Sequence, residues 1–238
     1  MIFKRDNVQI YYEVHGEGFP ILLFAPGGMR SAASFWRGSE WDPIDALSSD
    51  FQVIAMDQRN AGSSVAPVTG SDGWSTYTSD HIALADHLGL EKLHLMGGCI
   101  GGPYCFGFIE AAPDRVCSAI IQQSIGVDNN QDIFFDLFDS WATPIKDAHP
   151  EASEEDWLQF RSNMFEKDFL YNVDRDFIRQ CETPLWVLMG SDAFHPEVVS
   201  REIAELAPNA TLVEAWKNPD QDNTVAKALE FLHAHTPK

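Results

Sequence analysis

A cysteine inside a glycine-rich turn is the residue of this chain best placed for covalent chemistry. The turn Gly97–Gly101 reads Gly-Gly-Cys-Ile-Gly and lies between an expected strand and an expected helix. Small neighbours allow a sharp turn, and the free N–H groups at the start of a helix favour negative charge. This environment lowers the pKa of a thiol, so we predict that Cys99 is a nucleophile. The alternative interpretation is that Cys99 is a small buried apolar residue.

A cysteine nucleophile still needs an acid and a base, which protonate the leaving group and activate water. His195 follows Asp192 by three positions in the loop after an expected strand. We therefore predict that His195 is the base and that Asp192 orients it. His149 is the second choice for the base, and Asp128 is the second candidate for the acid.

The elements that must position these residues alternate between strands and helices. Apolar and β-branched runs predict strands within 7–18, 19–28, 51–56, 92–98, 115–124, 183–192 and 210–216. Helical patterns and caps predict helices within 77–91, 100–113, 196–208 and 223–235. Continuous apolar strands are typical of a parallel sheet that is buried on both faces. The order predicts an α/β fold with a doubly wound, mostly parallel sheet.

Residues 125–180 interrupt this alternation. The segment is dense in Phe, Trp and acidic residues and has no strand pattern, so we expect two to four short helices. We divide the chain into a core, 1–124 and 181–238, and a helical lid insertion, 125–180. Aromatic side chains of such a segment are often structural, but one face of a lid must meet the pocket. We expect substrate contacts from four of them: Phe135, Phe138, Trp141 and Phe165.

The order of these segments and the turn around Cys99 resemble the α/β-hydrolase family over nearly the whole chain. Four stretches carry the resemblance: YYEVHGEGFPILLFAPGG, VIAMDQRNAGSS, LADHLGLEKLHLMGGCIGG and TPLWVLMGSD. The resemblance implies helices on both faces of the sheet, a lid, and an active site at the carboxyl edge of the strands. It also implies an oxyanion hole made by the backbone N–H of Ile100 and that of Gly28 or Met29.

The chain departs from the family pattern where the catalytic His is expected. The stretch after the last strand, VEAWKNPDQDN, contains no His, whereas Asp192 matches the usual position of the acid. We expect a hydrolase that cleaves an ester, lactone or thioester-like carbonyl through a Cys99 acyl intermediate. One alternative is acyl transfer or C–C bond cleavage on the same scaffold. The other is a pseudo-hydrolase that binds a ligand without turnover.

Composition limits the classes of partner. The chain has 238 residues and a formal net charge of −20, which disfavours nucleic acid and anionic membrane surfaces. The four cysteines show no metal-site spacing, so we expect free thiols and neither a metal nor another cofactor. The amino-terminal residues lack a signal-peptide pattern, so we expect a soluble, cytoplasmic protein. The expected partner is a partly apolar small-molecule substrate, and a homodimer is compatible with the sequence.

Overall fold

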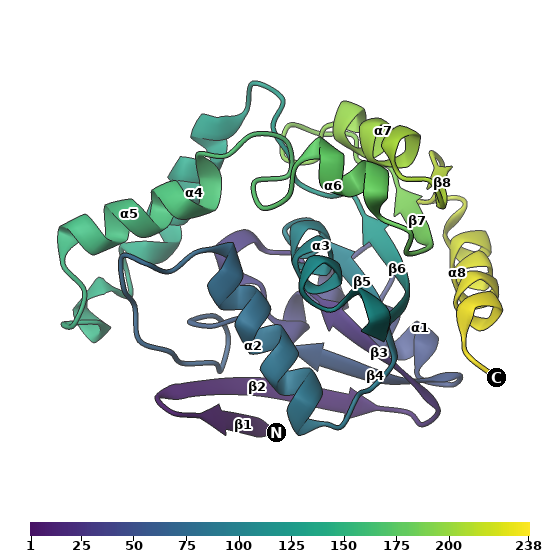
Figure 1. Cartoon of the computed structure of the whole chain (residues 1–238), viewed down its shortest axis with the longest axis horizontal. Coiled ribbons are helices and arrows are strands. Elements are labelled where there is room, and N and C mark those ends of the chain that lie inside the picture. Colours follow the sequence, from purple (N-terminus) through teal and green to yellow (C-terminus); the bar gives the residue numbers. More distant parts are fainter.

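The central strands are mainly apolar because helices cover both faces of the sheet they form (Figure 1). The computed structural model describes residues 1–238. Its central strands are β3 (Phe19–Phe24), β4 (Phe51–Met56), β5 (Leu93–Gly98), β6 (Val116–Gln122) and β7 (Leu185–Leu188). The outer strands are β1 (Ile2–Arg5), β2 (Val8–His15) and β8 (Ala210–Val213). The predicted α/β architecture is confirmed.

The strand order brings the loops of interest to one edge of the sheet. The eight strands run in the order β1-β2-β4-β3-β5-β6-β7-β8. β1 pairs antiparallel with β2, and β2 pairs antiparallel with β4, whereas all other neighbours are parallel. Because parallel strands end at the same edge, the loops that follow β3, β5 and β7 meet there. These loops carry Gly27, Cys99 and His195.

Two hydrophobic clusters lie on opposite faces of the sheet. The larger includes apolar side chains of α2 (Trp74–His87), α3 (Gly101–Ala111) and α7 (Glu197–Leu206). The smaller includes side chains of the short α1 (Pro43–Leu47) and of α8 (Gln221–His235). The sheet is therefore the middle layer of three, and its strands are shielded from water on both sides (Figure 1).

The segment between β6 and β7 is helical and contains no strand. It consists of α4 (Gln131–Ala142), η4 (Lys146–Ala148), α5 (Glu154–Phe165) and α6 (Arg175–Gln180). α4 and α5 lie side by side, joined by edge-to-face aromatic contacts with ring centroids 5.1 Å apart for Phe138–Phe160 and 5.9 Å apart for Trp141–Trp157. Figure 1 shows this helical pair at the end of the molecule that lies away from α8.

Several short elements were not predicted. They are β1, α1 and the 3-10 helices η1 (Gly28–Arg30), η2 (Ala33–Gly38) and η3 (Pro113–Arg115). Each is too short to show a clear hydrophobic period, although the side chain of Asp42 caps the start of α1 by accepting from the N–H of Ile44. None of the helices combines the length and the apolar character needed to cross a bilayer.

Candidate active site

Cys99 occupies a strained turn between β5 and α3. Its φ of 58° lies in the left-handed region, which costs a non-glycine residue about 1–3 kcal/mol. Backbone bonds hold the turn: the N–H of Cys99 donates to the carbonyl of Gln122 at 3.0 Å, and its carbonyl accepts from the N–H of Gly102 at 3.1 Å. A Cβ at Gly97 would lie 2.0 Å from the carbonyl oxygen of Gly101. The strand and the helix can therefore meet this closely only with glycine at position 97.

The loop after β7 supplies a histidine that is already oriented. Nδ1 of His195 lies 2.9 Å from Oδ2 of Asp192. The other carboxylate oxygen of Asp192 accepts from the backbone N–H groups of Phe194 and His195, each at 2.9 Å. Nε2 of His195 is buried and has no well-aligned hydrogen-bond partner. With Nδ1 donating to Asp192, Nε2 is the ring atom left free for chemistry.

Cys99 and His195 shift each other's pKa in opposite directions. Burial would raise the pKa of the thiol, but hydrogen bonding and charge from His195 bring it below its ordinary value. Burial would lower the pKa of His195, but Cys99 and then Asp192 bring it above its ordinary value. Nε2 of His195 has no hydrogen-bond partner in this structure, and catalytic hydrogen bonds often form fully only when a substrate binds. Both shifts favour a thiolate beside an imidazolium.

Two backbone N–H groups also face the sulfur, those of Gly27 and Ile100, and both lower the pKa of the thiol. Ile100 is the residue expected from sequence. In the first loop, the expected donors Gly28 and Met29 line the cavity as part of η1, and the N–H group that faces the sulfur is that of the preceding residue, Gly27. Its φ of 117° is one that glycine adopts readily.

A small cavity opens at Cys99 and His195, with a volume of about 240 Å³. Its walls are mainly apolar side chains: Met29, Ile100, Ile125, Phe134, Leu137, Phe165 and Phe194. Of these side chains, only Phe165 was expected from the sequence to contact a substrate. Phe194 lies between Asp192 and His195 in the chain, so its place in the same loop was the signal that could have identified it.

The other three expected aromatic contacts do not line this cavity. Phe138 and Trp141 are buried against α5, and Phe135 lies beneath the guanidinium of Arg161, 5.0 Å from the ring centroid. Phe134, Phe138 and Trp141 share one stripe of α4, because they are four and three residues apart. Only the first residue of this stripe reaches the cavity, and the later two pack between α4 and α5. From α4, the side chains that line the cavity are therefore Phe134 and Leu137 and not the expected Phe135, Phe138 and Trp141.

The alternative acid and base candidates lie elsewhere. Nδ1 of His149 is 2.9 Å from a carboxylate oxygen of Glu151, and its ring packs edge-on to Trp157. It does not line the cavity. Asp128 is exposed and is also absent from the cavity wall. After β8, where the family pattern places a His, the buried Trp216 donates from its indole N–H to the carbonyl of Met189 at 2.8 Å.

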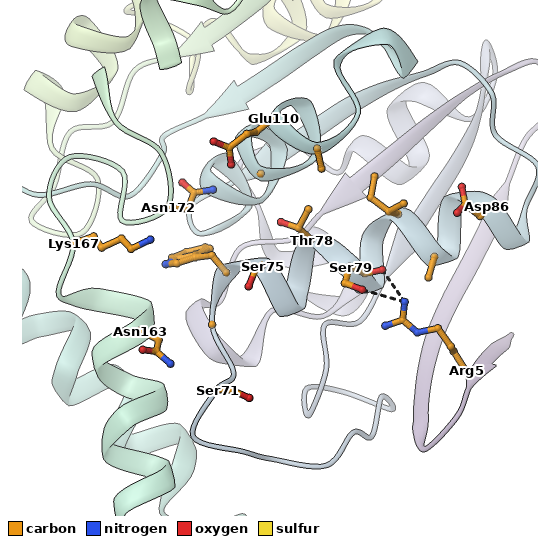
Figure 2. Close-up of a pocket in the computed structure, with 16 residues that line it drawn as sticks. Arg5, Ser71, Ser75, Thr78, Ser79, Asp86, Glu110, Asn163, Lys167 and Asn172 are labelled. Carbon is orange, nitrogen blue, oxygen red and sulfur yellow. Dashed lines mark hydrogen bonds between the residues drawn. The ribbon is translucent and has the colours of Figure 1, made fainter. Parts of the chain in front are cut away.

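A larger hollow of about 780 Å³ lies between α2, α3, the end of α5 and the loop that follows α5 (Figure 2). Its labelled side chains are polar or charged, among them Ser75, Thr78, Glu110 and Lys167, and it contains neither Cys nor His. Size therefore does not identify the reactive site; the smaller cavity holds the thiol and the imidazole. No three His, Cys, Asp or Glu side chains are grouped in a way that could hold a metal ion.

Comparison with known proteins gives a consistent family and fold. Residues 20–168 match the family model described as alpha/beta hydrolase fold. The protein assigned as carbamate hydrolase RutD in Azorhizobium caulinodans is 37% identical over 115 residues, which cover 48% of this chain and 41% of that protein. The chain thus spans less than half of this relative's length. The protein assigned as RutD in Caulobacter sp. strain K31 is 25% identical over 242 residues, covering 87% of each chain.

The solved structures extend the likeness of fold to the whole chain. The enol-lactonase from Burkholderia xenovorans LB400 superposes with a TM-score of 0.72, covering 98% of this chain and 100% of that one. Its sequence identity is 17%. A meta-cleavage product hydrolase from Pseudomonas fluorescens IP01 superposes with a TM-score of 0.71 at 21% identity, covering 96% of each chain.

Proposed function

This chain belongs to the α/β-hydrolase fold family, and from that premise we propose that it hydrolyses an ester, lactone or thioester-like carbonyl through an acyl intermediate on Cys99. The observation that carries the proposal is that Cys99 and His195 line the same small cavity, while Asp192 holds His195 by Nδ1. The relatives named as carbamate hydrolase and enol-lactonase support attack on a carbonyl carbon.

In the first half of the reaction, the Cys99 thiolate attacks the carbonyl carbon of the substrate. The developing oxyanion accepts hydrogen bonds from the N–H groups of Gly27 and Ile100, which already face the sulfur. The imidazolium of His195 then gives its Nε2 proton to the leaving group as the tetrahedral intermediate collapses. The product of this half is a thioester on Cys99, and His195 is left neutral.

In the second half, neutral His195 takes a proton from water, which attacks the thioester carbonyl and returns Cys99 to the thiolate. Asp192 stabilises the imidazolium that forms again through the bond to Nδ1. The side chain of His195 is 12% exposed, whereas that of Asp192 is 46% exposed, so the pair is open to solvent on the Asp192 side.

We also propose that the helical segment 125–180 is the lid of this site. Phe134 and Leu137 of α4 and Phe165 of α5 support this role, because they form one wall of the cavity that opens at Cys99. The lid would exclude bulk water from the oxyanion and select the acyl group of the substrate. A small-molecule substrate of partly apolar character suits this wall.

The proposal is tested by comparing ester turnover in the wild type, Cys99→Ala and Cys117→Ala. With 4-nitrophenyl butyrate we expect Cys99→Ala to lose at least about 10³-fold in kcat/KM, because no other nucleophile faces the cavity. Cys117, a partly exposed thiol that does not line the cavity, is the matched control and should retain wild-type turnover. An acyl group trapped on the Cys99 peptide after acid quenching identifies the intermediate by mass.

Full turnover in Cys99→Ala would exclude Cys99 as the nucleophile. Saturable binding without turnover in the wild type would instead identify a pseudo-hydrolase. Addition of an amine or thiol distinguishes hydrolysis from acyl transfer, because a transferase would form adducts in preference to the free acid.

A further inference from the structure

The cavity at Cys99 contains no fixed positive side chain that could pair with a charged substrate group. None of the lysines or arginines of the chain lines it, and its only ionisable side chains are Cys99 and His195. These two form the proposed reactive pair, so the positive charge of His195 is balanced by the thiolate of Cys99 and is not free to bind a carboxylate. A carboxylate bound beside the reacting carbonyl would therefore be desolvated without a partner, which is strongly unfavourable.

The net charge of the whole chain also disfavours a substrate that carries a carboxylate. The formal net charge is −20, so the field around the protein lowers the local concentration of anionic molecules. Oxyanion donors such as the N–H groups of Gly27 and Ile100 stabilise a charge that forms during the reaction. They are already engaged by the thiolate or by the oxyanion and cannot also hold a carboxylate of the substrate.

The walls and the mouth of the cavity are suited to an apolar group. The rings of Phe134 and Phe165 lie nearly parallel with centroids 5.5 Å apart, and both contribute to the wall. Phe194 lines the cavity while its ring remains partly exposed, and exposed Phe35 lies against the backbone of Gly27. An apolar acyl group would gain contact with these rings along its path from solvent to the thiol.

The volume sets the size of that group. A dry apolar cavity of about 150 Å³ holds one benzene ring of six carbons. In proportion, the volume of about 240 Å³ accommodates about ten non-hydrogen atoms. A phenyl-substituted or medium-length acyl group fits within this limit, whereas a long fatty acyl chain does not.

Building on the proposed hydrolase function, we propose that this enzyme selects uncharged apolar acyl groups of about ten non-hydrogen atoms or fewer and rejects acyl groups that carry a carboxylate. Leu137 is a specificity-determining residue in this proposal, because its half-buried side chain forms part of the wall that faces the acyl group.

The test compares three esters of the same leaving group: 4-nitrophenyl hexanoate, 4-nitrophenyl hydrogen glutarate and 4-nitrophenyl hexadecanoate. The rate with Cys99→Ala is subtracted from each, because the carboxylate of the glutarate ester promotes its own hydrolysis. We expect kcat/KM for the glutarate ester to be at least about 100-fold lower than for hexanoate, with a similar loss for hexadecanoate.

A pair of variants tests the cause of the selectivity. Leu137→Arg places a cation in the wall, so it should raise the ratio of glutarate to hexanoate turnover at least about tenfold. Leu158→Arg makes the same substitution on α5 at an exposed position outside the cavity, and it should leave the ratio unchanged. Circular dichroism melting of both variants identifies a loss of folding that would otherwise mimic a loss of turnover.

If turnover depends on Cys99 but the glutarate ester is as good a substrate as hexanoate, the charge selectivity is overturned and the hydrolase function stands. Equal turnover of hexadecanoate and hexanoate would likewise overturn the size limit. If no ester shows turnover that depends on Cys99, the proposed function fails, and the selectivity built on it fails with it. The wild-type comparison alone decides among these outcomes, even if Leu137→Arg does not fold.

Discussion

Cys99 differs from the other three thiols in the direction of its pKa shift. Burial raises the pKa of Cys105, Cys117 and Cys181, which therefore favours the neutral thiol. At Cys99, burial acts in the same direction, but His195 and two backbone N–H groups outweigh it. All four cysteines are free, so their reactivities can be compared within one molecule. The neighbours of Cys99, and not its burial, therefore set the direction of its pKa shift.

Alkylation by iodoacetamide at varied pH, resolved for each cysteine by peptide mass spectrometry, measures this difference. We expect Cys99 to react with an apparent pKa below the free-thiol value of about 8.5, because the thiolate is the reacting form. His195→Ala removes the partner that lowers this pKa, so the apparent pKa should rise and the rate at pH 7 should fall about tenfold or more. Cys117 serves as the internal control and should react alike in both proteins.

The opposite outcome is equally informative. If Cys99 follows the same pH profile as Cys117 in the wild type, the thiol is not activated and the turn has only a structural role. A low pKa at Cys99 that persists in His195→Ala would assign the activation to the backbone N–H groups alone.

At the scale of elements, the sequence identified the contributions that depend on one loop at a time. The turn at Cys99 has a local pattern of small residues, and Asp192 and His195 are neighbours in one loop. These residues could therefore be identified as candidates from local sequence, without knowledge of the strand order. Gly27 and Phe134 were missed for a different reason. Tertiary packing decides which N–H of a loop faces the sulfur. It also decides which end of a helix reaches the cavity, and hydrophobic periodicity predicts neither.

The close contact between β5 and α3 predicts that one methyl group added at Gly97 strongly lowers the free energy of unfolding. In Gly97→Ala the new Cβ would lie 2.0 Å from the carbonyl oxygen of Gly101 and 2.8 Å from the sulfur of Cys105. The helix and the strand would have to separate, so we expect the free energy of unfolding to fall by at least about 3 kcal/mol in urea titrations.

Gly38→Ala is the matched control for this substitution. Position 38 ends η2, is exposed, and has no heavy atom within 4 Å of the new Cβ. Its free energy of unfolding should change by no more than about 0.5 kcal/mol. Equal urea midpoints for the two variants would show that the turn at Cys99 does not require close contact between α3 and β5.

At the scale of the whole molecule, the alternation of strands and helices was predictable because the core strands are buried on both faces. The run Phe51–Met56 is apolar apart from Gln52, and the structure forms β4 over the same residues. β1 was missed because its four residues alternate in exposure and gain their stability by pairing with β2. Sequence pattern therefore predicts the elements that form the core. Short edge elements such as β1 depend on pairing with their neighbours and are not predicted.

The buried histidines predict how stability depends on pH. Burial lowers the pKa of His81 to about 3 and that of His94 to about 4. His81 bonds to Gln58 at 2.7 Å, and His94 lies between the hydroxyls of Ser118 and Thr236. In the unfolded chain both titrate near 6.5, so below that pH the unfolded state binds protons that the folded state does not. Their stabilisation is present above about pH 6.5 and is lost as the pH falls toward 4.

Urea unfolding of the wild type and His81→Gln between pH 7 and pH 4 tests this linkage. The fall in unfolding free energy per pH unit should be smaller in the variant by up to about 1.4 kcal/mol, one proton's worth. Relief of the acidic self-repulsion affects both proteins equally and cancels in the comparison. His87→Gln, at an exposed position of the same helix, should keep the wild-type slope, and an identical slope in His81→Gln would contradict a buried neutral imidazole.

Asp192 and His195 lie on one turn, so their arrangement depends on a short stretch of sequence. The carboxylate is bonded to the imidazole and to two N–H groups of the same turn, and neither β8 nor α8 supplies any of these bonds. The pair that would handle protons in the proposed mechanism therefore lies within a few consecutive residues. A change confined to the loop at the end of β7 is enough to introduce or remove it.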